Sequence, residues 1–280
     1  MDMTSARLLV FTDMDGTLLD HDDYSWQAAA GALAKLTELE VPVICNTSKT
    51  FAEVKQLHVQ IGLSSPFIVE NGSAIYSADS KGANQVTHKL GANRLQILQD
   101  LAILRQQGHE FSGFNDWSNA EIIQHTGLSE QEAELSSQRQ YSEPLLYSGS
   151  ENDKAQFIQQ LSNKNYLALQ GGRFLSIQGQ CDKGKALMLL KAEYQKLWQT
   201  PVITIALGDS QNDCAMLEAA DVSVWIKSHK AFPQINKKQQ VFYSNLVGPA
   251  GWNETMAHIL LLHSNNQLEQ IEPTISELAK

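Results

Sequence analysis

The chain has 280 residues, which is long enough to bury one large hydrophobic core or two smaller ones. Its hydrophobic share of 42% and charged share of 19% are ordinary for a globular protein and exclude disordered and fibrous classes. The formal net charge of −10 argues against general affinity for nucleic acids or anionic membranes, so we expect neither as a partner.

The first third of the chain alternates between strand and helix patterns. Short apolar runs predict buried strands at 8–11, 41–45 and 66–70, and helical spacing predicts helices at 25–40 and 51–61. The third strand leads into Asn71-Gly72, a pair typical of tight turns, and a return strand begins at Ala74. This alternation indicates βαβ units with right-handed crossovers, and therefore a parallel sheet.

Around residue 80 this alternation stops, and the small polar residues of 77–84 mark a boundary. Helix patterns then follow at 93–107 and 153–162, with extended segments at 144–148, 166–170 and 174–177. After 180 the first rhythm returns, with helices at 183–194 and 213–219 and strands at 202–207 and 222–225. We therefore predict an α/β fold: a Rossmann-like parallel-sheet core of residues 1–82 and 180–280, with an inserted α+β cap domain of residues 83–179.

Two carboxylates one residue apart, Asp13 and Asp15, directly follow the first apolar strand. In open α/β sheets ligands bind at the carboxyl ends of the strands. Because two acidic groups this close repel each other, we expect a cation or a shared proton between them. Gly16 permits a tight turn, and Thr17 offers a hydroxyl and a backbone N–H to an anion. The alternative is an Asp-rich turn that merely closes a strand.

A second pair of carboxylates follows the apolar strand 202–207. Asp209 and Asp213 lie four residues apart across a turn and a helix start, so both can face one point in front of the strand end. Carboxylate oxygens at the ends of two parallel strands suit Mg²⁺, which completes its octahedron with water and phosphate. Asp213 could instead serve as an ordinary N-cap of the helix.

Two further segments suit phosphate. Thr47 and Ser48 follow the second strand at a helix start, where orphan N–H groups and the helix dipole favour an anion, although an ordinary N-cap is the simpler alternative. Lys183 stands at the start of the helix after the inserted module, where a cation is unfavourable to the dipole, so a bound phosphate would explain it.

Together these segments resemble the four ordered motifs of the haloacid dehalogenase-like phosphatases, and the inserted module looks like their larger α/β cap. The motifs here are Asp13-x-Asp15-Gly16-Thr17, Thr47, Lys183 and Gly208-Asp209-Ser210-x-Asn212-Asp213. Other segments resemble the mannosyl-3-phosphoglycerate phosphatase family over nearly the whole chain: Asn46 to Thr50, Pro66 to Gly72, Gly172-Arg173-Phe174 and Gly248-Pro249-x-Gly251-Trp252.

The resemblance implies that Asp13 attacks phosphorus to form an aspartyl-phosphate, and that Asp15 acts as the general acid and then the general base. It implies Mg²⁺ held by Asp13, Asp209 and the backbone carbonyl of Asp15, with Asp213 supporting through water. The phosphate-binding residues that we expect are Gly16, Thr17, Thr47, Ser48, Lys183 and Asn212.

The implied substrate is a small phosphorylated sugar acid, mannosyl-3-phosphoglycerate, hydrolysed to mannosylglycerate and phosphate. Its carboxylate calls for an arginine fork in the cap, for which Arg173 is our first candidate and Arg139 the second. Glu143 is a candidate acceptor for sugar hydroxyls. Three alternatives stay open: a related sugar-phosphate or glucosyl-3-phosphoglycerate phosphatase, a phosphomutase, and a non-catalytic phosphate-binding module.

The sequence also predicts where the protein works. The N-terminus shows no basic segment followed by a long apolar stretch, and no later run is long enough to cross a membrane. Its three cysteines are widely spaced, which predicts neither a disulfide framework nor a zinc site: Cys45, Cys181 and Cys214. We therefore expect a cytoplasmic protein.

Overall fold

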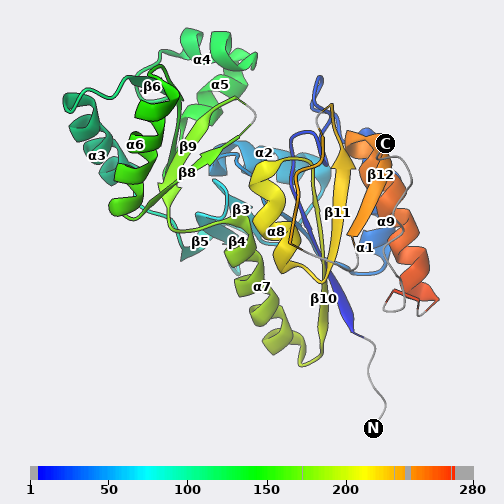
Figure 1. The fold of residues 1–280 in the computed structure, drawn as a ribbon. Coiled ribbons are helices and arrows are strands. Elements are labelled where there is room, and N and C mark those ends of the chain that lie inside the picture. Colours follow the sequence, from blue (N-terminus) through cyan, green and yellow to red (C-terminus); the bar gives the residue numbers. More distant parts are fainter. Residues whose placement is uncertain (1–5, 172, 230, 237–240, 266, 269–280) are drawn as a thin grey trace. The chain divides into compact units, whose positions relative to one another are not determined.

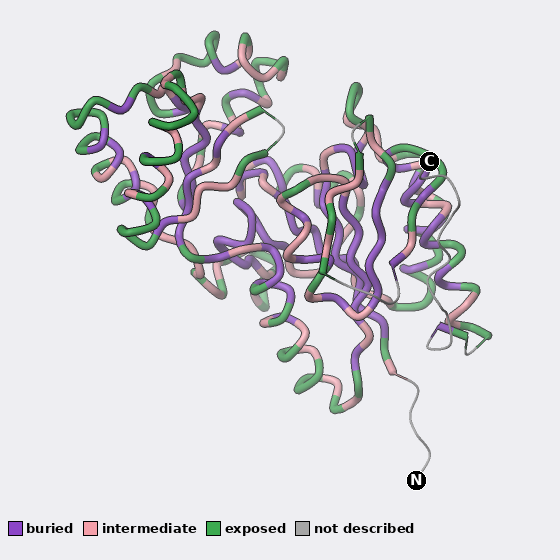
Figure 2. Tube along the Cα trace, viewed as in Figure 1, coloured by how far each residue is buried: buried purple, intermediate pink, exposed green. Residues whose placement is uncertain are grey.

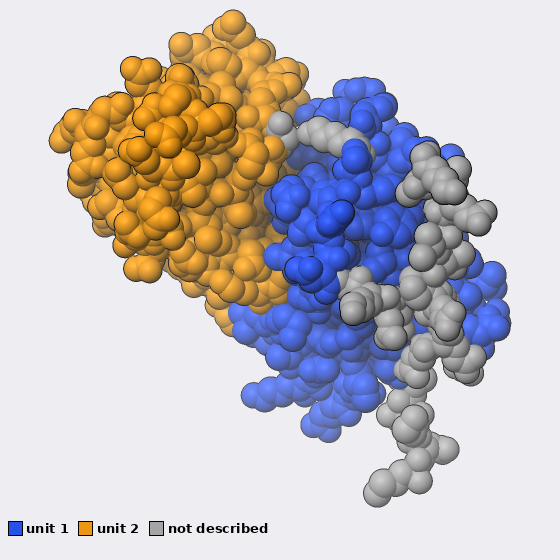
Figure 3. Space-filling view, in the orientation of Figure 1, with its two compact units in different colours: residues 1–47, 187–280 blue, residues 48–186 orange. Residues whose placement is uncertain are grey.

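The computed structural model describes residues 6–171, 173–229, 231–236, 241–265 and 267–268, and Figure 1 shows its elements. Gly172, part of one segment quoted above, lies outside the described residues. The chain forms two compact units, drawn in blue and orange in Figure 3. The first comprises Met1–Thr47 and Leu187–Lys280, and the second comprises Ser48–Ala186.

The first unit contains a five-stranded parallel sheet with the order β12-β11-β10-β1-β2. Its strands are β1 (Arg7–Thr12), β2 (Val43–Cys45), β10 (Val202–Gly208), β11 (Val222–Lys227) and β12 (Val241–Val247). All neighbouring pairs are parallel, as the alternating pattern predicts. Strand β1 is buried from Leu8 to Thr12, which explains its unbroken apolar run (Figure 2).

Helical elements accompany this sheet: η1 (Gln27–Ala29), α1 (Ala30–Glu38), η2 (Gln211–Asp213), α8 (Cys214–Ala219) and α9 (Gly248–Ser264). The expected helix over 25–40 is shorter, because it begins as a 3₁₀ turn and Glu40 adopts a positive φ of 52° beyond its end. Helices α1 and α9 pack against each other, and α9 also packs on β11 and β12.

The second unit holds two antiparallel sheets. One has the order β3-β4-β5, with β3 (Phe67–Val69), β4 (Ala74–Ala78) and β5 (Asn84–Lys89). The other has the order β6-β7-β9-β8, with β6 (Phe111–Gly113), β7 (Ser142–Tyr147), β8 (Tyr166–Gln170) and β9 (Leu175–Gly179). Helices α3 (Arg94–Gln106) and α6 (Glu151–Asn163) share a buried apolar core with the second sheet. The unit also contains α2 (Phe51–Ile61) and the first residues of α7 (Lys183–Trp198).

The polar stretch between β6 and β7 forms two short helices, α4 (Asn119–Thr126) and α5 (Glu130–Ser137). Each begins with a capping box, in which Ser118 pairs with Glu121 and Ser129 pairs with Glu132. They pack together around a small core centred on Phe114, so local capping rather than a strong apolar stripe defines them.

The predicted fold class is confirmed: a parallel-sheet α/β core accompanied by an α+β part. The predicted helices at 93–107 and 153–162 correspond to α3 and α6, and the extended segments correspond to β7, β8 and β9. The division into a core of residues 1–82 with 180–280 and an inserted cap of residues 83–179 stays a prediction. Among the described residues, no helix is both long and apolar enough to cross a membrane.

The Asn-Gly turn after β3 has an unusual backbone, because Glu70, Asn71 and Gly72 have φ values of 48°, 57° and 91°. Left-handed conformations cost a non-glycine residue roughly 1–2 kcal/mol, so the turn needs support. The buried Glu70 carboxylate accepts the N–H groups of Gln140 and Tyr141, at 2.9 and 3.0 Å, and the Ser142 hydroxyl at 2.6 Å.

The far side of this turn is also closely packed. A Cβ at Gly72 would overlap the Asp182 carbonyl, so only glycine fits there. The side chain of Gln178 donates to the carbonyls of Asn71 at 3.3 Å and Cys181 at 2.9 Å. The turn is thus tied to the segment that leads directly into Lys183.

The stability of the second unit is expected to depend on pH through His58 in α2. Its imidazole is buried against Phe67, with 5.0 Å between ring centroids, and burial lowers the pKa of His58 below its ordinary value of 6.5. The unfolded chain therefore binds a proton more readily at this residue, and the free energy of unfolding should fall as the pH drops through 6.5.

Urea unfolding between about pH 7 and about pH 5 tests this, with His58→Gln beside the unaltered chain and the exposed His21→Gln as the matched control. We expect a shallower pH dependence in the His58 variant alone. Equal slopes for all three proteins would contradict the assignment.

Candidate active site

The paired strands β1 and β10 place Asp13 and Asp209 at the same edge of the parallel sheet. Thr12 lies opposite Leu207 in the register, and the N–H of Asp13 then donates to the carbonyl of Leu207 at 2.9 Å. Asp209 follows directly after Gly208, the last residue of β10. The two strand ends therefore deliver their carboxylates side by side, as the sequence predicts.

Three carboxylates gather here, because Asp213 joins Asp13 and Asp209. One oxygen of each lies within 4.8 Å of the others. Asp213 is fully buried and Asp13 is 5% exposed, so solvent screens their mutual repulsion poorly. Three hard oxygen donors at this separation form a group that suits a divalent cation.

The geometry of Asp213 is determined by the turn between β10 and α8. Its Oδ2 accepts the N–H groups of Asp209 at 3.1 Å and Ser210 at 3.0 Å. A Cβ at Gly208 would lie 2.5 Å from the Asp213 Cβ, so a glycine is required at the end of β10. The neighbouring Asn212, predicted to bind phosphate, accepts the Ser210 hydroxyl at 2.5 Å.

The loop after β1 folds back toward Asp209. Gly16 has a φ of +72°, and a Cβ there would lie 3.1 Å from Oδ2 of Asp209. The Thr17 hydroxyl donates to Oδ1 of Asp209 at 3.3 Å, and its N–H donates to the Met14 carbonyl at 3.1 Å. In this structure Thr17 therefore supports the carboxylate cluster, and its role toward phosphate stays a prediction. Asp15 precedes Gly16 in the same loop and is partly exposed.

Cysteines near the cluster are not activated. Burial, with the negative charge of Asp13, raises the pKa of the Cys45 thiol to about 12. Burial and the charge of Asp213 raise the pKa of Cys214 to about 11. Both thiols are neutral at pH 7, which agrees with a packing role and excludes a thiolate nucleophile.

The remaining predicted phosphate residues are divided between the two units. Thr47 follows β2, which pairs with β1, and it is fully buried in the first unit. Ser48 and Lys183 belong to the second unit, where Lys183 is the first residue of α7 and is also fully buried. A buried ammonium requires close polar partners, which fits an anion site without identifying the anion. Their roles stay predictions.

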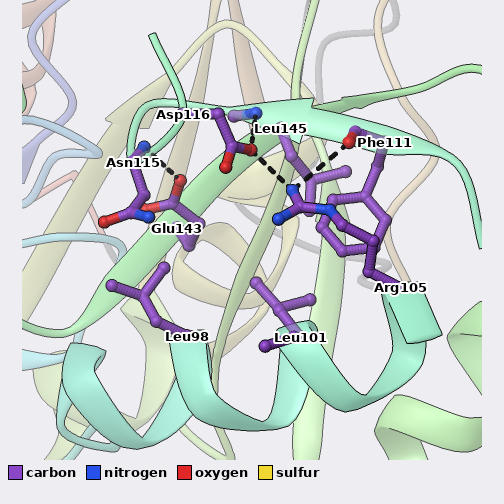
Figure 4. Close-up of a pocket in the computed structure, with 10 residues that line it drawn as sticks. Leu98, Leu101, Arg105, Phe111, Asn115, Asp116, Glu143 and Leu145 are labelled. Carbon is purple, nitrogen blue, oxygen red and sulfur yellow. Dashed lines mark hydrogen bonds and ion pairs between the residues drawn. The ribbon is translucent and has the colours of Figure 1, made fainter.

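Of the predicted substrate residues, Glu143 already has partners within the second unit. Its carboxylate pairs with Arg94 at 2.7 Å and accepts the Asn115 N–H at 2.8 Å. Burial raises the pKa of Glu143, and the nearby Arg94 opposes this shift. Glu143 lines a pocket of about 90 Å³ beside α3, together with Arg105 and Asp116 (Figure 4).

The two predicted arginines lie in different surroundings. Arg139 donates to the carbonyl of Ser48 and the hydroxyl of Ser142, both at 3.2 Å, and its guanidinium lies 5.1 Å from the Phe114 ring centroid. Arg173 is exposed and donates to the carbonyl of His125 at the end of α4. Arg94 was missed by sequence reasoning, since no local pattern links it to a carboxylate 49 residues away.

The carboxylate cluster predicts cation-dependent stability. A divalent cation that binds only the folded chain should raise the free energy of unfolding by about 2.7 kcal/mol at about 100 times its dissociation constant. Asp213→Asn removes one charge and should lose most of this increment, measured by thermal unfolding with and without the cation. Asp153→Asn, an exposed carboxylate in the first turn of α6, is the matched control. An unchanged increment in Asp213→Asn would contradict cation binding here.

The chain is similar to known proteins. A model of the haloacid dehalogenase-like hydrolase family matches residues 10–231. The glucosyl-3-phosphoglycerate/mannosyl-3-phosphoglycerate phosphatase of Methanococcoides burtonii is 34% identical over 92% of this chain and 98% of its own length. The protein of the same name from Persephonella marina is 31% identical over 90% of this chain and 97% of its own length.

A solved structure matches this chain at the level of the fold. It belongs to a phosphatase of the haloalkanoate enzyme superfamily from Bacteroides thetaiotaomicron and matches with a TM-score of 0.67 and 16% identity, over 93% of this chain and 98% of that one. The structural match shows a shared fold, and the family model together with the sequence matches leads to one assignment: the chain belongs to the haloacid dehalogenase-like hydrolase family.

Proposed function

We propose that this protein is a Mg²⁺-dependent phosphatase that hydrolyses mannosyl-3-phosphoglycerate to mannosylglycerate and phosphate through an aspartyl-phosphate. The observation that carries the proposal is the cluster of Asp13, Asp209 and Asp213 at the ends of β1 and β10, with Asp15 two residues from Asp13. Membership of a hydrolase family and two phosphatase relatives support it.

In this proposal Asp13 and Asp15 divide the chemistry. The Asp13 carboxylate attacks phosphorus and the sugar-acid oxygen leaves, taking a proton from Asp15. Asp15 then removes a proton from the water that attacks the aspartyl-phosphate, which releases phosphate and restores Asp13. Asp15 is more exposed than Asp13, and this suits a group that exchanges protons with a leaving group and with water.

The charge on the phosphoryl group has to be offset, because the chain as a whole is acidic. Asp13, Asp209, the backbone carbonyl of Asp15 and, through water, Asp213 would hold Mg²⁺, whose positive charge lowers the repulsion between nucleophile and phosphate. Thr47, Lys183 and the other predicted phosphate residues would donate to the phosphoryl oxygens as charge develops on them.

The substrate proposal rests on the relatives and on the chemistry of the second unit. Both curated relatives carry names with a hexosyl-3-phosphoglycerate substrate, so the glucosyl compound is the second candidate. Either substrate carries a carboxylate beside its phosphate ester, which an arginine fork would bind. Arg139 and Arg173 are the candidates, and Glu143 is proposed to contribute to binding of the sugar.

Phosphate release tests the proposed reaction. The panel contains mannosyl- and glucosyl-3-phosphoglycerate, 3-phosphoglycerate and simple hexose phosphates, each with and without Mg²⁺. We expect the mannosyl compound to be hydrolysed fastest, and Asp13→Asn to lower kcat by several orders of magnitude because the nucleophile is lost.

The control is Asp153→Asn, which lies in α6 and should match the unaltered chain. Preference for the glucosyl compound would keep the mechanism and change the substrate. Absence of Mg²⁺-dependent hydrolysis from every ester would overturn the phosphatase proposal and favour a phosphate-binding module.

The arginine proposal is tested with paired substrates. Arg139→Met and Arg173→Met should each be assayed with mannosyl-3-phosphoglycerate and with a hexose phosphate that lacks a carboxylate. The arginine that binds the carboxylate should lose about 10- to 100-fold in kcat/KM for the first substrate only, the loss of a charged hydrogen bond. Equal losses with both substrates would contradict carboxylate recognition.

A further inference from the structure

The buried side chain of Trp252 is joined to the backbone of Asp13 through one hydroxyl group. Its indole nitrogen donates to Oγ1 of Thr12 at 3.0 Å, and this hydroxyl donates to the carbonyl of Asp13 at 2.7 Å. Trp252 and Thr12 are both fully buried, so the two hydrogen bonds are shielded from water. They connect α9 with the end of β1 inside the first unit.

The chemistry of the donor determines the direction of this chain. An indole N–H can only donate, so the Thr12 oxygen has to accept from Trp252, and its own hydrogen is then directed to the Asp13 carbonyl. Hydrogen bonds in series polarise one another, and a low dielectric strengthens them. Trp252 therefore decides which way the Thr12 hydroxyl points.

The Asp13 carbonyl belongs to the peptide group that leads from Asp13 toward Asp15. The peptide on the other side of Asp13 is also held, because its N–H donates to Leu207. The carbonyl of Met14 in turn accepts the N–H groups of Thr17 at 3.1 Å and Leu19 at 2.8 Å. With the Thr12 bond in place, each peptide group from the end of β1 to Met14 has a specific partner.

The start of α9 is built so that Trp252 reaches Thr12. A Cβ at Gly251 would overlap the Leu246 carbonyl, so a glycine is needed for α9 to lie this close to the end of β12. The side chain of Asn253 accepts the N–H of Ala32 at 2.8 Å, which ties the same turn to α1. This explains a segment, Gly248 to Trp252, that has no role in the chemistry proposed above.

We infer that Thr12 and Trp252 are positioning residues, which hold the Asp13–Met14 peptide and thereby aim the Asp13 carboxylate at phosphorus. The inference rests on the proposed function, because it takes Asp13 as the nucleophile. Both residues are fully buried and act on Asp13 through its backbone carbonyl. A nucleophile displaced by about 1 Å can lose up to about 10²-fold in rate, so an indirect hold of this kind has a measurable effect.

Substitutions that keep the shape and remove one hydrogen-bonding group test the inference. Thr12→Val and Trp252→Phe should each lower kcat by about 10-fold and leave KM within about twofold, because substrate binding is untouched. Thr12→Ser retains the hydroxyl and should recover most of the loss. The double variant should be no slower than Thr12→Val, since both substitutions break the same connection.

The matched control is Thr204→Val. Thr204 is a fully buried threonine on the neighbouring strand β10. Its hydroxyl donates to Asp221 at 2.7 Å and accepts the Asp221 N–H at 3.0 Å. It lies opposite Leu9 in the middle of β1, away from the strand end that carries Asp13. The Thr204→Val substitution should lower the melting temperature and leave kcat unchanged. Every variant is assayed well below its own melting temperature. Under this condition, a residue with only a structural role changes the melting temperature and not kcat.

Asp13→Asn is assayed in parallel to separate this inference from the proposed function. If Thr12→Val leaves kcat unchanged while Asp13→Asn is inactive, the inference is overturned and the proposed function stands. If the losses in kcat of the two single variants multiply in the double variant, Trp252 does not act through Thr12, and that part of the inference is overturned. An active Asp13→Asn would overturn the proposed function, and this inference with it.

Discussion

The site depends on the parallel hydrogen bonding between β1 and β10, which brings groups together that repel one another. Asp13 and Asp209 follow strand ends that lie side by side, and Asp213 is turned toward them by two backbone N–H groups. Without the sheet, three carboxylates would separate in water. The stability of the sheet therefore keeps a concentrated negative charge in place, and the charge of Asp13 adds to the effect of burial in raising the pKa of Cys45. The glycines at 16 and 208 serve the same end, because any larger residue would displace a carboxylate.

In the second unit, by contrast, acidic side chains are used to hold the chain together. Glu70 satisfies three donors from the segment that enters β7, and Glu143 is paired with Arg94. Both carboxylates are almost fully buried, so their partners compensate for lost hydration. The hydrogen bonds of Arg139 and Arg173 go to carbonyl and hydroxyl oxygens of the same unit, and these two arginines remain the ones that we propose for an acidic substrate.

Much of the fold could be predicted because its signals are local. The buried run of β1 and the Asn-Gly turn are each specified within a few residues, and four ordered motifs located the carboxylates. Helices α4 and α5 were not predicted, because their capping boxes lie in a polar stretch without a strong apolar stripe. The partners that hold these elements could not be predicted, since hydrogen bonds between distant residues leave no periodic pattern. Nothing near Glu143 in the sequence indicates its pairing with Arg94, and its role toward a sugar stays a prediction. Trp252 was recognised only as part of a resemblance, because its partner lies at the other end of the chain.

The distance along the chain between these partners has a consequence for biosynthesis. Thr17 and Asp209 are 192 residues apart, and Thr12 and Trp252 are 240 residues apart. Protein synthesis proceeds from the N-terminus, so the segment carrying Asp13 leaves the ribosome long before the residues that complete and brace its surroundings. A nascent chain therefore carries Asp13 and Asp15 without the other carboxylates of the cluster and without the Trp252 hydrogen bond, until β10 and then α9 have been made. The order of elements along the chain therefore delays completion of the carboxylate cluster until η2 has been made, and delays the Thr12–Trp252 contact until α9 has been made.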